Sequence, residues 1–195
     1  MMLGNSRLRY GAVAMTLHWL LAAAILFMLG LGLFMTGLEE TDPRTFPLFQ
    51  FHKSIGLTIL VLSVARLLWR LANPVPPPPA QSRRWERVSA RAVHVLFYVL
   101  MIAIPLMGWA TVSSSPLAVP TMWFGLFEWP HIPFLADLPR AEKRLIEGPL
   151  AGTHGALALS MLVLAGLHAA AALKHHFRDR DDVLKRILPW TKLPT

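Results

Sequence analysis

Four long apolar segments constrain the fold of this chain more than any other feature. They lie at about residues 14–36, 52–72, 93–113 and 152–174. A helix needs about 20 consecutive apolar residues to cross the roughly 30 Å hydrocarbon core of a membrane, and each segment meets that length. Of the 195 residues, 54% are hydrophobic and only 15% are charged, which is typical of a membrane protein. The sequence therefore predicts an all-α membrane protein, in which residues 1–195 form a single four-helix transmembrane bundle.

The charged residues between these segments predict the orientation of the helices. Lys and Arg are concentrated before the first segment, after the second and after the fourth, whereas the first connection carries Glu39, Glu40 and Asp42. Basic loops stay on the cytoplasmic side of a membrane, where they face lipid headgroups. We therefore expect both termini in the cytoplasm and the first and third loops outside. This placement accounts for the net charge of +8 without a nucleic-acid partner.

The third loop, from Ser113 to Pro149, is long and rich in Trp and Phe. Such aromatic residues are typical of a segment that lies in the outer membrane interface. They would equally suit the entrance to a binding site, and the sequence does not separate the two interpretations.

The fourth apolar segment carries a histidine near each end. His154 and His168 are 14 residues apart, which is about 1400° of rotation on an ideal helix, or about 40° short of four turns. The two imidazoles therefore share one face and lie roughly 21 Å apart along the axis. Ionisable residues at such depths in a membrane are unfavourable and indicate function.

Two further histidines complete the pattern, because His18 starts the first span and His52 starts the second. The fourth helix enters from outside, so depth matches His18 with His168 near the inner face and His52 with His154 near the outer face. A lone histidine near a helix end is more often an ordinary interfacial residue. Four that match in depth favour two bis-histidine sites, as two b-type haems require. The predicted iron ligands are His18 and His168 for the inner haem, and His52 and His154 for the outer haem.

Other residues on the same helices are weaker candidates. His94 is the rival to His18, but it is expected at the very start of the third span, among the headgroups. Arg66 lies 14 residues after His52, so it should share the depth of the inner haem and could pair with a propionate. Snorkelling of Arg66 to the headgroups is the alternative. Gly32 could leave room for the outer haem, although small residues also mediate ordinary helix packing.

The remaining composition narrows the metal chemistry. The chain contains no cysteine, which excludes disulfides, covalent c-type haem, cysteine-bound iron–sulfur clusters and thiolate zinc sites. It also lacks a His-Glu-x-x-His motif and any carboxylate within the spans. An intramembrane metalloprotease or a metal transporter is therefore disfavoured.

Several short motifs occur along the chain. They are Leu17-His-Trp-Leu, Phe51-His-Lys-Ser-Ile-Gly, Val64-Ala-Arg-Leu-Leu-Trp-Arg, Asn73-Pro-Val-Pro-Pro, Thr153-His and Gly166-Leu-His-Ala-Ala-Ala-Ala-Leu-Lys-His-His. Together these motifs resemble the prokaryotic cytochrome b561 family over about residues 8–188. The resemblance implies four transmembrane helices in a bacterial inner membrane, with two haem b groups held by the four histidines named above.

The resemblance also implies a function. Members of this family are di-haem electron carriers linked to the quinone pool, and one is a superoxide oxidase. We therefore expect electron transfer from a periplasmic one-electron donor, with superoxide favoured, to ubiquinone. Lys53 would attract an anionic donor to the outer haem, although it could be an ordinary interfacial lysine. Thr16, Arg87 and His175 are inner-side candidates for the quinone site, and His175 could exchange protons.

An alternative function involves a protein donor. The chain would then be a haem-bearing membrane anchor that links a separate dehydrogenase or hydrogenase to quinone. The third loop looks longer than in some members of the family, which leaves the donor open. The sequence does not determine the oligomeric state.

Overall fold

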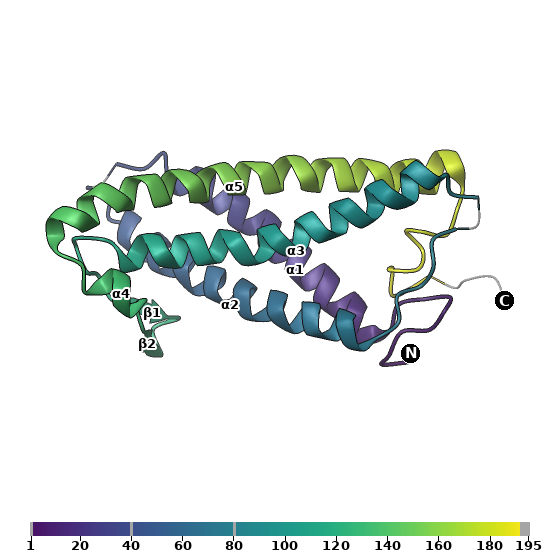
Figure 1. The fold of residues 1–195 in the computed structure, drawn as a ribbon, viewed down its shortest axis with the longest axis horizontal. Coiled ribbons are helices and arrows are strands. Elements are labelled where there is room, and N and C mark those ends of the chain that lie inside the picture. The colour runs from purple at the N-terminus through teal and green to yellow at the C-terminus, as the bar shows by residue number, and fades with distance from the viewer. Residues whose placement is uncertain (1, 40, 80, 192–195) are drawn as a thin grey trace.

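Four long helices dominate the computed structural model, which describes residues 2–39, 41–79 and 81–191 (Figure 1). Each helix is long and apolar enough to cross a membrane. The sequence-based expectation of four membrane-spanning helices is therefore confirmed. The helices are α1 (Ala12–Met35), α2 (Thr45–Ala72), α3 (Arg84–Ser113) and α5 (Arg140–Lys174).

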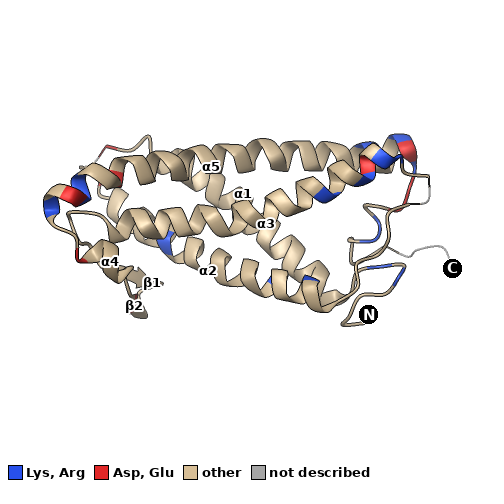
Figure 2. Ribbon diagram, viewed as in Figure 1, with Lys and Arg blue, Asp and Glu red and all other residues tan. Residues whose placement is uncertain are grey.

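The two ends of the bundle differ. The N-terminal and C-terminal segments lie at one end, together with the proline-rich connection between α2 and α3 (Figure 1). We call this the terminal end, and many Lys and Arg residues gather there (Figure 2). The opposite end, which we call the hairpin end, carries the strands β1 (Thr121–Trp123) and β2 (Phe127–Trp129) and the short helix α4 (Pro133–Ala136).

The expectation of an all-α fold is wrong for the loop before α5. Strands β1 and β2 pair antiparallel, with Met122 opposite Glu128. Phe124 and Gly125, in the turn between the strands, both have positive φ angles (48° and 73°), as tight hairpin turns require. Strands of three residues are too short for an alternating pattern to be recognised in a sequence rich in aromatic residues.

Side-chain hydrogen bonds hold the hairpin on α2. The buried Ser54 hydroxyl accepts the backbone N–H of Phe124 at 3.0 Å and lies 3.0 Å from the Met122 carbonyl oxygen. The Trp123 indole N–H donates to the Thr58 hydroxyl at 3.2 Å. The hairpin therefore packs against the face of α2 that carries Ser54 and Thr58.

The helices are packed in the order α1, α2, α3, α5, whereas α1 and α5 touch only slightly. Many large apolar side chains face outward, as expected where the surrounding solvent is lipid. The buried core is small and draws on all four helices. It consists of Leu21, Ile59, Leu100, Met101, Met161 and Leu164.

Helices α3 and α5 extend beyond the predicted apolar spans. Helix α3 begins at Arg84 rather than near residue 93, and α5 begins at Arg140 rather than near residue 152. The added residues are rich in charge, so a hydropathy pattern stops before the helix does. At the start of α3, the Glu86 carboxylate accepts the backbone N–H of Arg83 at 2.9 Å. This early start places His94 well inside α3.

Candidate functional site

Two pairs of histidines lie at two levels of the bundle. Near the hairpin end, the ring centroids of His52 on α2 and His154 on α5 are 6.1 Å apart. Near the terminal end, those of His18 on α1 and His168 on α5 are 6.5 Å apart. These are the same residues that the depth argument matched, and α5 contributes one imidazole to each pair.

Both separations suit a metal ion held between two imidazoles. A metal–imidazole nitrogen bond is about 2 Å long, and the ring centre lies about 1 Å beyond the nitrogen, so an axial pair has ring centres about 6 Å apart. The rings of the hairpin-end pair are inclined at 73° and those of the terminal-end pair at 66°. The residues present therefore fit two bis-imidazole metal sites.

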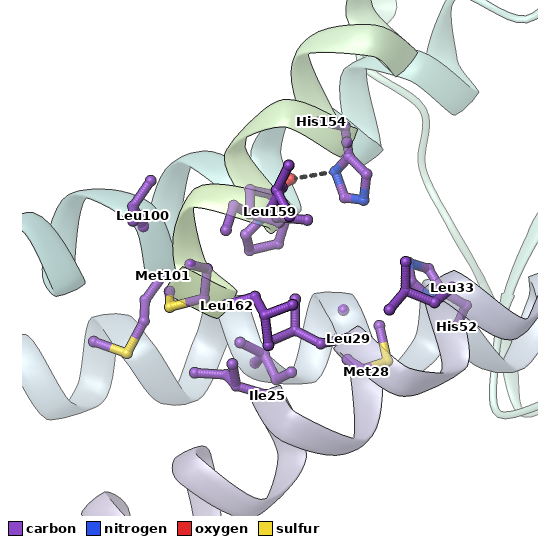
Figure 3. A pocket seen from close by; sticks show the side chains of 18 of the residues that line it. Ile25, Met28, Leu29, Leu33, His52, Leu100, Met101, His154, Leu159 and Leu162 are labelled. Carbon is purple, nitrogen blue, oxygen red and sulfur yellow. Dashed lines mark hydrogen bonds between the residues drawn. The ribbon is translucent and has the colours of Figure 1, made fainter. Parts of the chain in front are cut away.

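A largely apolar cavity of about 230 Å³ adjoins the hairpin-end pair (Figure 3). All four long helices line it, and His52 and His154 supply imidazoles to its wall. Gly32 on α1 is part of the lining, and a β-carbon at this position would lie 3.7 Å from Cε1 of His52. An apolar chamber with imidazoles from two helices suits a flat, apolar macrocycle such as haem b.

The orientation of His154 is set by the backbone of α3. Its Nδ1–H donates to the Ile104 carbonyl oxygen at 2.9 Å, which leaves the lone pair of Nε2 free (Figure 3). A metal-ligating histidine typically donates its other ring N–H in this way. The ring approaches α3 so closely because residue 108 is glycine. A β-carbon on Gly108 would lie 3.2 Å from Cε1 and 3.3 Å from Nδ1 of His154.

The His52 ring presents a different environment. Its Nδ1 is buried and has no hydrogen-bond partner within the described part of the chain. Buried polar atoms are usually hydrogen-bonded, and an unpaired one requires an explanation, such as a bound ion. A ring with a buried, unpaired nitrogen beside its partner His154 is compatible with ligation of a metal.

Arg66 lies at the terminal-end pair, at the level that its spacing from His52 predicted. Its guanidinium donates to Nδ1 of His18 at 3.2 Å and to the Ala14 carbonyl oxygen at 3.4 Å. Both bonds tie α2 to α1, so the side chain turns into the bundle instead of extending along it. Arg66 thus places a positive charge directly beside the terminal-end site.

His94, which the sequence interpretation ranked below its rival His18, also lies in the terminal-end site. Its ring centroid is 5.8 Å from that of His168, closer than His18. Phe97, one turn further along α3, packs against His168 at 5.2 Å. The signal for His94 was present in the sequence, because Gly108 follows it by the same 14 residues that separate His154 from His168.

The three candidates for a quinone site lie at the terminal end but are not joined to one another. Thr16 is exposed on α1, and Arg87 donates to the Ser82 carbonyl oxygen. His175 begins the π-helical turn η1 (His175–Asp179), and its Nδ1 lies 2.7 Å from a carboxylate oxygen of the buried Asp181. Within the described residues, no hydrogen bond or ion pair links His175 to Thr16 or Arg87.

Positive charge gathers at the hairpin end around His131. Burial lowers the pKa of His131, nearby Lys53 and Lys143 lower it further, and Glu128 opposes them. Lys53 also donates to the Pro120 carbonyl oxygen at 3.3 Å. Lys143 at the start of α5 is only 8% exposed. Sequence reasoning missed Lys143, because its position beside the hairpin depends on how α5 packs.

A bundle of four membrane helices with paired imidazoles at two levels defines the class of membrane-bound b-type cytochromes. Comparison with known sequences identifies the particular family. Residues 9–190 match the family model described as prokaryotic cytochrome b561, so the chain belongs to that family. The resemblance read from the sequence motifs is therefore confirmed.

Curated relatives of similar length share this family. Cytochrome b561 homolog 2 of Escherichia coli K12 is 38% identical, with 94% of this chain and 93% of the relative covered. A protein from Yersinia pestis named "Probable superoxide oxidase CybB" is 30% identical, with 93% and 96% covered. Family membership implies that this membrane protein binds haem b and has a general electron-transfer role.

Proposed function

We propose that this chain carries electrons across the bacterial inner membrane through two haem b groups, from a periplasmic one-electron donor to ubiquinone. The observation that carries the proposal is the presence of two imidazole pairs, 6.1 and 6.5 Å apart, at two levels of one membrane bundle. The hairpin end then faces the periplasm, and the terminal end, rich in Lys and Arg, faces the cytoplasm. All of this takes place in one transmembrane unit spanning residues 1–195.

Four histidines hold the two groups in this proposal. His52 and His154 bind the outer iron, and His18 and His168 bind the inner iron. When bound, each haem would supply a one-electron iron couple, and ligation by two histidines would confine it to outer-sphere electron exchange. The hydrogen bond from Nδ1 of His154 to the Ile104 carbonyl would hold the ring with Nε2 free to bind the iron.

An apolar layer separates the two levels. Ile59, Met101 and Met161 are buried. Each is the midpoint of a 14-residue interval on its own helix: His52 to Arg66, His94 to Gly108, and His154 to His168. Seven residues are about 10 Å along a helix, so these side chains lie midway between sites roughly 21 Å apart. The same three side chains also line the cavity beside the hairpin-end pair, so the groups between the two levels are apolar and carry no ionisable atom.

Superoxide is the donor that the hairpin end supports best. Lys53 and Lys143 lie around His131 and would attract a small anion to the end of the bundle that holds His52. The relative named as a probable superoxide oxidase supports the same donor. The balanced reaction is two superoxide, one ubiquinone and two protons giving two O₂ and one ubiquinol.

At the terminal end, the chain must supply the two protons that quinone reduction consumes. His175 is the candidate, because it lies past the end of α5 and is hydrogen-bonded to the Asp181 carboxylate. A carboxylate partner holds the imidazole in one orientation. Thr16 and Arg87 are proposed as neighbours of the quinone headgroup at this end.

The test is a reaction of the purified protein in lipid nanodiscs with enzymatically generated superoxide and a soluble ubiquinone analogue. We expect reduction of the haems followed by formation of quinol, and superoxide dismutase should abolish both. Absence of haem reduction by superoxide would contradict the proposed donor. Fewer than two haems per chain would contradict the two-site arrangement.

A haem-bearing anchor for a separate dehydrogenase or hydrogenase is the second candidate. Large apolar side chains are exposed at the hairpin end, among them Leu117, Leu126 and Phe134. Such a patch could receive a protein donor. Efficient quinone reduction by superoxide with the purified chain alone would remove the reason for this alternative.

A further inference from the structure

The terminal-end site contains three imidazoles, whereas the proposed ligation uses two. His94 lies 5.8 Å from His168 and His18 lies 6.5 Å from it, measured between ring centroids. Both separations are close to the roughly 6 Å expected for two imidazoles on opposite sides of one metal ion. Distance therefore does not exclude His94 as the second ligand.

The 14-residue spacing found on each of the four helices places His94 in the terminal-end site. Gly108 faces His154 at the hairpin-end level, because a β-carbon at position 108 would lie only 3.2 Å from Cε1 of His154. A separation of 14 residues returns to nearly the same helix face, so His94 faces the terminal-end level. Each long helix contributes one such interval to the two sites: His18 and Gly32, His52 and Arg66, His94 and Gly108, and His154 and His168.

The two rivals differ in what contacts their rings. Nδ1 of His18 accepts a hydrogen bond from the Arg66 guanidinium, so a neutral His18 in this arrangement carries its proton on Nε2. Ligation through Nε2 requires the proton on Nδ1, which would direct an N–H at the Arg66 donor. His94 has no hydrogen bond to a guanidinium within the described residues. His18 must therefore displace Arg66 in order to bind, and His94 need not.

We propose that the terminal-end haem site is a three-histidine site, in which His168 is the constant ligand and His94 can replace His18 as its partner. This inference rests on the proposed di-haem function. The exchange breaks one iron–nitrogen bond and forms another, and it moves no electron. The iron stays low-spin and bis-histidine with either partner.

The test compares haem retention in purified single and double variants. His18→Ala should keep two haems per chain, both low-spin by electron paramagnetic resonance, and so should His94→Ala. The double variant His18→Ala/His94→Ala should lose one low-spin signal, by loss of the haem or by its conversion to high-spin. His52→Ala is the matched control, because the aromatic contacts of the hairpin-end pair include no third imidazole in the described part of the chain. This single substitution should be enough to lose one low-spin signal.

The outcome for His18→Ala decides the proposal. Loss of a low-spin haem in that single variant, as in His52→Ala, would overturn the role of His94. A second series compares His18→Gly with His18→Gly/His94→Ala, each with and without added imidazole. Recovery of a low-spin signal on adding imidazole shows that the variant is folded and lacks only a ligand. Imidazole should restore the low-spin signal only in the double variant, and a need for imidazole in His18→Gly alone would also overturn the proposal. His168→Ala separates the two hypotheses, because two low-spin haems in that variant would contradict the proposed function itself.

Discussion

The two histidine sites of this bundle differ in charge and in how many imidazoles they contain. The terminal-end site has three imidazoles and a guanidinium within hydrogen-bond distance of His18. The hairpin-end site has two imidazoles beside an apolar cavity lined with glycine. In the proposed function, the charge of Arg66 stabilises the reduced state of the inner haem, because an added electron is attracted to it. The difference between the sites would therefore drive electrons from the hairpin end toward the terminal end.

The largest expected effect comes from removing the imidazoles that α5 contributes to the two sites. His154→Ala should abolish the hairpin-end haem and His168→Ala the terminal-end haem, since each variant lacks the ligand that α5 supplies to that site. Each variant should fall from two haems to one per chain in a pyridine haemochromogen assay. Loss of both haems from a variant that is otherwise folded would show that the two sites are not independent.

Filling the space beside His154 should have the next largest effect. Gly108→Val places a branched side chain where even a β-carbon would lie 3.2 Å from the ring, so it should displace His154 from the Ile104 carbonyl. We expect weakened or lost ligation at the hairpin end and an unchanged terminal-end spectrum. Gly30→Val is the control, because no atom within the described residues lies within 4 Å of a β-carbon at Gly30. Equal effects of both substitutions would mean that Gly108 matters only for helix stability.

Neutralising Arg66 should reduce the difference between the sites. A unit charge about 10 Å away at an effective dielectric of about 20 contributes about 1.7 kcal/mol. For one electron this corresponds to roughly 70 mV, so Arg66→Gln should lower the potential of the terminal-end haem by that order. A spectroelectrochemical titration measures the shift, with the exposed Arg84→Gln as the control. An unchanged potential would contradict the electrostatic account of the direction of electron flow.

The smallest expected effect concerns the donor side. Lys53→Gln removes one of the positive charges near His131, so it should slow haem reduction by superoxide about two- to threefold at low ionic strength. The effect should diminish as salt is added, because exposed charges are screened. Stopped-flow reduction rates measure it, with Arg84→Gln at the opposite end as the control. A rate that is insensitive to both Lys53 and salt would favour a protein donor over an anion.

Much of the architecture could be predicted from single segments of the sequence. Whether a helix can cross a membrane depends on the length and hydropathy of that helix alone, so four spans were found correctly. The shared face of His154 and His168 likewise follows from the periodicity of one helix. The family resemblance expected over about residues 8–188 agrees with the match over 9–190, because its motifs are local strings of residues.

Features that involve two elements were harder to foresee. His94 was expected at the start of its span, because hydropathy ends where charge begins, while α3 continues back to Arg84. The hairpin was missed because its strands are three residues long and are held by Ser54 and Thr58 of α2. In both cases the structure depends on residues outside the sequence segment concerned.

The contrast has one physical origin. Hydrophobic length, loop charge and the 14-residue spacing of histidines are properties along one helix, and they establish how many helices cross and which faces carry ligands. The approach of Gly108 to His154, the contact of Arg66 with His18 and the place of His94 beside His168 depend on the rotation and tilt of neighbouring helices. Those angles arise from the packing of all four helices together, so the contact of His94 with His168 is visible only in the folded bundle.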